Sequence, residues 1–149
     1  MSLSNIFAIS GSAMSAQTVR LNTVASNMAN VDSVASSADQ TYRARKPVFS
    51  QMINDNMRKH GWNRALKDES GAGIGVKVDA IVESDAPLQP RYEPDHPMAN
   101  EEGYVFYPNV NPIEEMADMM SASRSFQTNV EIMNSAKSMM QKMLMLGQS

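Results

Sequence analysis

The prolines of this chain mark where long helices can form. All seven lie between residues 47 and 112, at positions 47, 87, 90, 94, 97, 108 and 112 of the 149-residue sequence. Proline inside a helix removes a hydrogen bond and clashes with the preceding turn. The two proline-free ends can therefore form long helices, whereas the middle is restricted to strands, turns and extended segments.

The N-terminal end carries a helical repeat with very little charge. Residues 1–38 contain two charged side chains, Arg20 and Asp32, and 20 of the 38 positions are Ala, Ser or Asn. Apolar residues alternate at spacings of three and four, which predicts a helix of about 27 residues, roughly 40 Å long. We expect it to end near residues 30–33. The apolar positions of this seam are Leu3, Phe7, Met14, Leu21, Val24, Met28 and Val31.

The uncharged outer face of this helix has two interpretations. A helix without charge is usually enclosed by protein, and enclosed Ser and Asn would then need hydrogen-bond partners on adjacent elements. Alternatively, the Ser and Asn side chains are simply solvated.

The C-terminal end predicts a second helix, from Pro112 to a stop at Gly147. Acidic residues lie near its start and lysines near its end, as the helix dipole favours. Residues 113–149 hold eight of the fourteen methionines. The apolar stripe consists of Met116, Met119, Phe126, Val130, Met133, Met140 and Leu144, and it is widened by Ala122, Ala136 and Met143. It is either an intramolecular core or an interface that adapts to non-identical neighbours, because Met fills irregular gaps.

The middle of the chain reads as extended. Residues 42–49 and 74–83 alternate as strands do, and 91–110 predicts a loose hairpin with its turn at 100–103. Residues 50–73 fit a short helix followed by a loop. The sequence therefore predicts an α+β fold, with two long terminal helices paired as a coiled-coil-like discontinuous domain and a small β-rich middle inserted. The helical domain comprises 1–38 and 109–149, and the β-rich segment comprises 39–108.

A basic stretch stands out within the middle segment. Residues 43–67 contain one acid, Asp55, against the cations Arg43, Arg45, Lys46, Arg58, Lys59, Arg64 and Lys67. They form either a solvated loop or a contact with an acidic neighbour or peptidoglycan. A third alternative is nucleic acid stacked on Trp62. The net charge of −3 argues against a dedicated nucleic-acid binder.

Several classes of protein are disfavoured by what the sequence lacks. The chain has no cysteine, and its two histidines, His60 and His96, show no metal-ligand spacing. There is no nucleophile elbow, phosphate loop or zinc-protease motif. We therefore expect no enzyme, cofactor or metal site. We also expect no membrane insertion and no cleaved signal peptide, because the apolar runs are too short.

Both ends of the chain resemble a known family. The segment SAMSAQTVRLNTVASNMAN (12–30) is similar to the N-terminal signature of bacterial flagellar rod and hook proteins. The segment at 103–148 carries GYV, PNV and ASRSFQTNVE at the spacing of the FlgC-type rod proteins, and YRARKPVF (42–49) and YEPDHPMA (92–99) also resemble that family. The resemblance covers roughly 1–49 and 74–149, whereas 50–73 departs from it.

The resemblance implies a structural subunit of the proximal rod, the drive shaft that transmits torque across the periplasm. Such subunits are exported unfolded by the flagellar type III apparatus without a cleaved signal peptide. Their terminal helices pair and pack against those of neighbours, while the middle faces outward. The implied partners are copies of itself, rod proteins of the FlgB, FlgF and FlgG types, and FliE, which joins the rod to the membrane ring.

Interface residues follow from the two seams together with this implied assembly. They are Leu3, Phe7, Met14, Leu21, Val24, Met28, Met119, Phe126, Val130, Met133, Met140 and Leu144. The alternative function is a coiled-coil adaptor whose basic middle binds an acidic protein. An enzyme acting on peptidoglycan is disfavoured because no carboxylate pair stands in a catalytic context.

Overall fold

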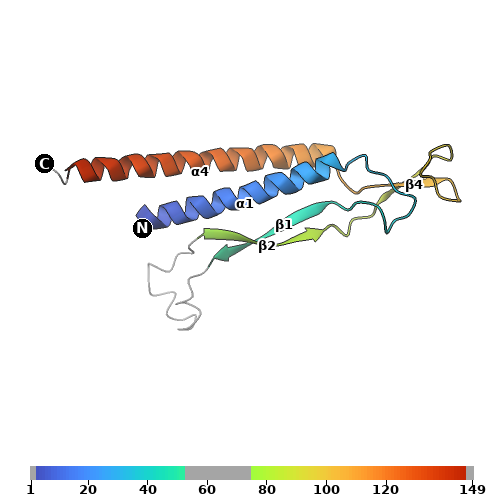
Figure 1. Cartoon of the computed structure of the whole chain (residues 1–149), viewed down its shortest axis with the longest axis horizontal. Coiled ribbons are helices and arrows are strands. Elements are labelled where there is room, and N and C mark those ends of the chain that lie inside the picture. The colour runs from blue at the N-terminus through green and yellow to red at the C-terminus, as the bar shows by residue number, and fades with distance from the viewer. Residues whose placement is uncertain (1–2, 53–74, 147–149) are drawn as a thin grey trace, which may run out of the picture. The chain divides into compact units, whose positions relative to one another are not determined.

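The computed structural model describes residues 3–52 and 75–146 (Figure 1). The elements are helix α1 (Leu3–Ala29), strands β1 (Arg45–Met52), β2 (Gly75–Glu83), β3 (Gln89–Tyr92) and β4 (Tyr104–Tyr107), and helix α4 (Pro112–Leu146). The α+β class is therefore confirmed, with two terminal helices and small strand pairs between them. The expectation of a short helix within 50–73 falls almost wholly outside the described residues.

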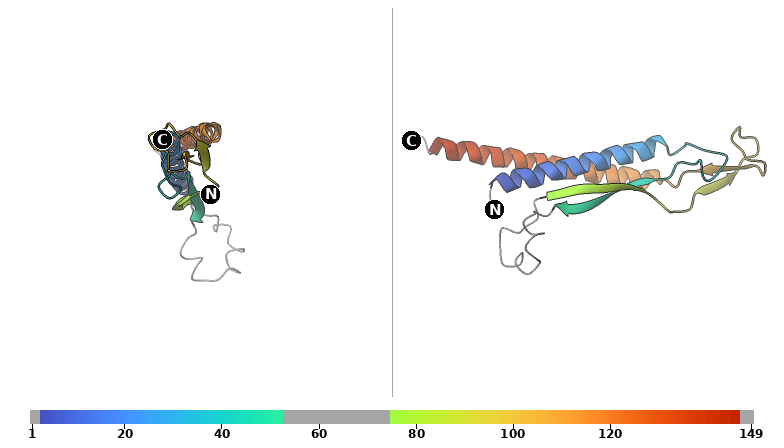
Figure 2. Two further views of the ribbon diagram at one scale, coloured as in Figure 1. Left: turned by 90° about the vertical axis from the view of Figure 1, so that its right-hand side faces the viewer. Right: turned by 60° about the horizontal axis from the view of Figure 1, so that its bottom comes forward.

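The strands form two separate pairs. β1 pairs with β2, and the two lie side by side and run in opposite directions in Figures 1 and 2. β3 pairs with β4 antiparallel, with Gln89 opposite Tyr107 and Tyr92 opposite Tyr104. This pair is the hairpin that the sequence predicts around 100–103.

β1 begins three residues later than the alternation predicts. At this end of the strand, side chains accept the backbone N–H groups: that of Ala44 donates to Oδ1 of Asn109 at 2.7 Å and that of Arg45 to Oδ1 of Asn27 at 2.9 Å. The carbonyl of Ala44 accepts the N–H of Ser84 at 2.8 Å, and β1 itself starts at Arg45.

The ends of both helices follow local rules. α4 starts at Pro112, and the side chain of Asn111 caps it by accepting the N–H of Ile113 at 3.1 Å. Glu114 and Glu115 lie in its first turn, where the helix dipole favours negative charge. α1 ends in a turn in which the N–H of Ser33 donates to the carbonyl of Asn30 at 3.1 Å.

The chain divides into two compact units. One comprises Met1–Val19, Phe49–Asp79 and Ala122–Ser149, and the other comprises Arg20–Val48 and Ala80–Ser121. In the first unit the most buried residues are small: Ser10, Ala16, Ala122 and Ala136. In the second unit they are Thr23, Val24, Asn27, Ala35, Thr41, Ala44, Val105, Val110 and Glu115.

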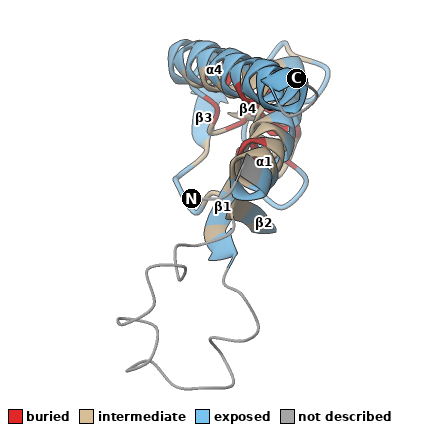
Figure 3. Ribbon diagram, turned by 90° about the vertical axis from the view of Figure 1, so that its left-hand side faces the viewer, coloured by how far each residue is buried: buried red, intermediate tan, exposed pale blue. Residues whose placement is uncertain are grey.

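Much of the α4 surface is exposed, whereas α1 is mostly half-buried. In Figure 3, pale blue covers most of α4, and red is confined to a few positions. Within residues 3–52 and 75–146, neither helix combines the length and the apolar character needed to cross a membrane.

Candidate functional site

The seam residues of α1 are partly covered by the chain itself. Val24 is buried, with 4% of its surface exposed. Phe7, Met14, Leu21 and Met28 are half-buried, and Leu3 is the first residue of the helix. The large apolar residues therefore keep part of their surface available to a neighbour.

The seam residues of α4 become more exposed towards its C-terminus. Met119, Phe126, Val130 and Met133 are half-buried, whereas Met140 and Leu144 expose 39% and 64% of their surface. Other apolar side chains of the same stretch are equally open: Ile132, Met139, Met143, Met145 and Leu146 expose between 43% and 77%. The last turns of α4 thus carry several large apolar side chains that the rest of the chain leaves exposed.

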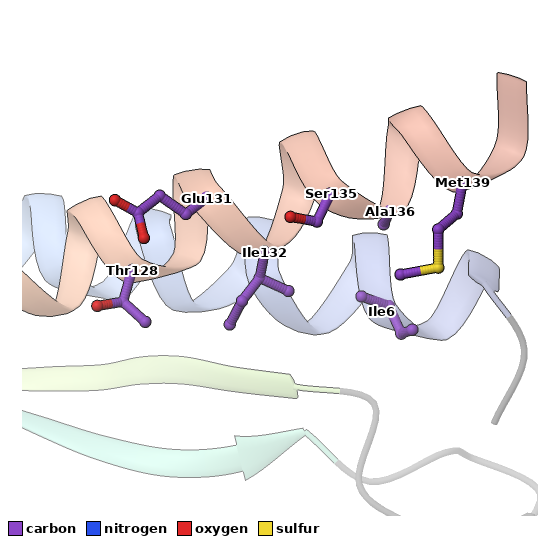
Figure 4. Close-up of a pocket in the computed structure, with 7 residues that line it drawn as sticks. All are labelled: Ile6, Thr128, Glu131, Ile132, Ser135, Ala136 and Met139. Carbon is purple, nitrogen blue, oxygen red and sulfur yellow. The ribbon is translucent and has the colours of Figure 1, made fainter. Parts of the chain in front are cut away.

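A shallow groove opens between the two helices in the first unit. It has a volume of about 340 Å³ and is lined by Ile6 of α1 and by Thr128, Glu131, Ile132, Ser135, Ala136 and Met139 of α4. Figure 4 shows Met139 and Ile6 reaching towards each other across it. Its lining is mostly apolar, with one acid at the rim, so the groove suits an apolar side chain better than a charged ligand.

A polar junction holds the second unit together. Asn27 of α1 exposes 1% of its surface, and its Nδ2 donates to the carbonyl of Arg45 at 2.8 Å and to Oε1 of Glu115 at 3.0 Å. Its Oδ1 accepts the N–H of Arg45 and the hydroxyl of Tyr42, both at 2.9 Å. One amide side chain thus ties α1 to β1 and to the start of α4, with its hydrogen bonds satisfied.

Glu115 is the charged member of this junction. It exposes 5% of its surface, and its Oε2 is buried without a hydrogen-bond partner. Burial raises the pKa of this carboxyl above its ordinary value of 4.5, and the hydrogen bond from Asn27 works against that rise. A buried carboxylate with an unpaired oxygen costs stability whenever it is ionised.

Two further contacts fasten the same unit. Asn109 donates to the carbonyls of Ser84 and Ala86 at 3.1 and 2.8 Å, in addition to accepting from Ala44. Arg20 forms an ion pair with Asp118 at 2.6 Å between α1 and α4. These contacts connect α1, β1 and α4 within the unit.

Neither Asn27 nor Glu115, the two central residues of the polar junction, is among the interface residues expected from the sequence. Asn27 stands in the quoted ASN sequence, and an enclosed Asn was expected to need partners on adjacent elements, which Asn27 has. Asn22 and Ser15 of the same helix are exposed, so the enclosed interpretation fits only part of that face. The sequence places Glu115 in the first turn of α4, but that position is equally typical of a solvated acid, so its burial could not be predicted.

Comparisons with known proteins place both ends of the chain in flagellar families. The family described as "Flagella basal body rod protein" matches residues 7–35, and "Flagellar basal body rod FlgEFG protein C-terminal" matches residues 101–146. The flagellar basal-body rod protein FlgC of Escherichia coli O157:H7 is 49% identical over 148 residues, covering 99% of this chain and 100% of that protein. FlgC of Salmonella typhimurium LT2 is 47% identical over the same length and with the same coverage. FlgC of Bacillus subtilis 168 is 38% identical over 143 residues, covering 93% of this chain and 94% of that protein.

Proposed function

Since the chain belongs to the FlgC family of flagellar basal-body rod proteins, we propose that it polymerises through its terminal helices into the proximal rod and transmits torque there. As a family member it is a structural component of the flagellar basal body rather than an enzyme.

The observation that carries the proposal is the open apolar surface of α4. In the single chain, between 39% and 77% of the residue surface is exposed at Met140, Met143, Leu144, Met145 and Leu146. Soluble monomers rarely leave such a run uncovered, and burying apolar surface releases about 25 cal/mol per Å². Packing against helices of neighbouring subunits would cover it.

We propose that the two helices pair in a coiled-coil-like manner as the core of the rod wall, from segments 1–38 and 109–149, with 39–108 facing outward. The small buried residues support this, because Ala16, Ala122 and Ala136 allow close approach of backbones. The twelve seam residues, from Leu3 to Leu144, then serve as the subunit interface. Eight of them are half-buried, and Met140 and Leu144 are exposed, so these side chains keep surface for that contact in the single chain.

The proposed partners are copies of the same chain, rod proteins of the FlgB, FlgF and FlgG types, and FliE. We further propose that the type III apparatus exports the chain without a cleaved signal peptide and that it functions in the periplasm. Association with other rod components follows from family membership, and the individual partners are part of the proposal.

The assembly surface is tested by adding a charge where the single chain is already exposed. Leu144→Asp should leave the urea midpoint of the purified protein unchanged, since Leu144 is 64% exposed. In cells it should abolish incorporation into basal bodies and swimming, because a carboxylate buried without a partner costs several kcal/mol. Gln141→Asp, an exposed polar position one turn earlier, is the matched control.

Phe126→Asp probes the half-buried part of the same seam and should also block motility. Normal swimming with Leu144→Asp protein present in isolated basal bodies would refute the interface. If the protein is instead recovered with an acidic soluble partner and never in basal bodies, the coiled-coil adaptor is the better description.

A further inference from the structure

The β3–β4 hairpin exposes an aromatic face that the helix assembly does not use. Its register sets Tyr92 opposite Tyr104, so both side chains lie on one face of the pair. Their rings meet edge to face with centroids 5.4 Å apart. Tyr92 is 65% exposed, Tyr104 is 40% exposed, and Met98 in the connecting loop is 42% exposed. Tyr and Met are residue types enriched in protein interfaces.

The loop that connects the strands is held in one conformation by its own hydrogen bonds. Oδ1 of Asn100 accepts the N–H groups of Glu102 and Tyr104 at 3.0 and 2.8 Å. Nδ1 of His96 accepts the N–H of Met98 at 3.1 Å. Gly103 has a φ of +80°, and a Cβ there would lie 2.9 Å from the Tyr92 ring. A face that is already ordered loses little entropy on binding.

Exposed acids lie in the loop that connects the two strands. They are Asp95, Glu101 and Glu102, and residues 93–103 contain no Lys or Arg. Glu93 belongs to the opposite face, where its carboxylate accepts the hydroxyl of Tyr107 at 3.4 Å. The neighbouring cation, Arg91, lies on the opposite face of the strand pair, with its guanidinium 4.2 Å from the ring of Tyr107. The tyrosine face therefore suits a cationic segment, since cations stack on aromatic rings and complementary charge speeds association.

The same chain contains such a segment. Residues 58–67 (RKHGWNRALK) hold four Lys or Arg and no acid. We propose that the Tyr92–Tyr104 face of one copy binds segment 58–67 of a second copy.

This contact goes beyond the proposed helix assembly and depends on it only because rod formation brings copies together. It is heterologous, because the surface used on one copy differs from the surface used on the next. Contacts of this type extend into rings or open filaments rather than closing as symmetric dimers. The basic stretch left unassigned by the sequence thereby acquires a binding partner.

Cysteine cross-linking tests the contact cleanly, because the chain has no cysteine of its own. Full-length Glu101→Cys and Arg64→Cys proteins, carrying different tags, are mixed at low salt and treated with a flexible bismaleimide. We expect a dimer that contains both tags, in purified protein and in basal bodies from cells co-expressing the two variants. Asp39→Cys mixed with Arg64→Cys is the control, because Asp39 is an exposed acid outside the hairpin.

Charge reversal gives an independent readout. Replacing Asp95 and Glu102 by Lys alongside the Glu101→Cys probe should lower the cross-linking yield about tenfold, and Glu at Arg58, Lys59 and Lys67 of the Arg64→Cys partner should restore it. Yield no higher than the Asp39→Cys control overturns the proposal. So does a cross-link that forms only within a chain carrying both cysteines. Motile cells without this cross-link would refute the hairpin contact while leaving the rod function intact.

Discussion

The buried amide of Asn27 offers the sharpest test of how the second unit is stabilised. Asn27→Ala removes two hydrogen bonds to the backbone of Arg45, one to the carboxylate of Glu115 and one from Tyr42. A neutral hydrogen bond contributes about 1 kcal/mol net and one to a charged group about 2 kcal/mol. Tyr42 keeps Ser26 as a second partner at 3.3 Å, so its loss is partly offset.

These contributions sum to about 3–5 kcal/mol, a large share of the roughly 5–15 kcal/mol by which native domains are stable. We therefore expect a strongly lowered urea midpoint with an unchanged slope in purified Asn27→Ala protein. The matched control is Asn129→Ala, whose amide donates to the Ser125 carbonyl of its own helix at 2.8 Å. That variant should lose less than about 1 kcal/mol.

The result that would refute this reasoning is a loss below about 1 kcal/mol for Asn27→Ala, equal to that of the control. It would mean that water or a rearranged Glu115 replaces the amide at no cost. Asn27→Asp is a second test of the same contact, since it keeps the shape of the side chain but sets a second carboxylate against Glu115. This variant should be at least as destabilised as Asn27→Ala at neutral pH and should recover as the pH is lowered.

Further changes probe other parts of the chain. In Glu115→Gln protein, which lacks the buried charge, the urea midpoint should be higher at pH 7. Wild-type stability should rise as pH falls from the raised pKa of Glu115 towards 4.5, because the folded state binds the proton first, and this rise should be smaller in the variant. Gly103→Ala should cost about 1–3 kcal/mol in a urea titration, because Gly103 has a positive φ and no room for a Cβ beside Tyr92. Gly11 lies inside α1, and a Cβ added there meets no atom within 4 Å. Gly11→Ala should therefore stabilise the protein by about 0.5–1 kcal/mol, because alanine is the better helix former. Arg20→Met should lower the free energy of unfolding by less than about 1 kcal/mol in a urea titration, since the Arg20–Asp118 ion pair is partly solvated.

The extent of the helices could be predicted from the sequence because local rules determine it. Proline positions and apolar spacing bounded both helices, and the observed α1 and α4 start and end close to those limits. The hairpin of β3 and β4 was likewise signalled by its prolines and by the turn at residues 100–103.

What could not be predicted was which residues each helix would bury. Spacing placed the large residues Met119, Phe126 and Met133 in one stripe with Ala122 and Ala136. It did not show that the two alanines would be buried while the large residues stay half-buried, nor that Glu115 would be buried. Apolar periodicity finds a stripe but not the side of the stripe that faces the nearest helix. The Asn27–Glu115 contact joins residues 88 positions apart, so no local pattern contains it.

The polar junction also determines the axial offset between the two helices of the second unit. Small side chains such as alanine present a smooth surface, along which one helix can slide past another at little cost. A hydrogen bond from Asn27 to Glu115 tolerates shifts of only tenths of an ångström, whereas the next equivalent helical position lies a full turn, about 5.4 Å, away. Apolar burial therefore holds the two helices together, whereas the buried amide of Asn27 fixes their relative axial position. Every copy of the chain then has the same offset between its helices.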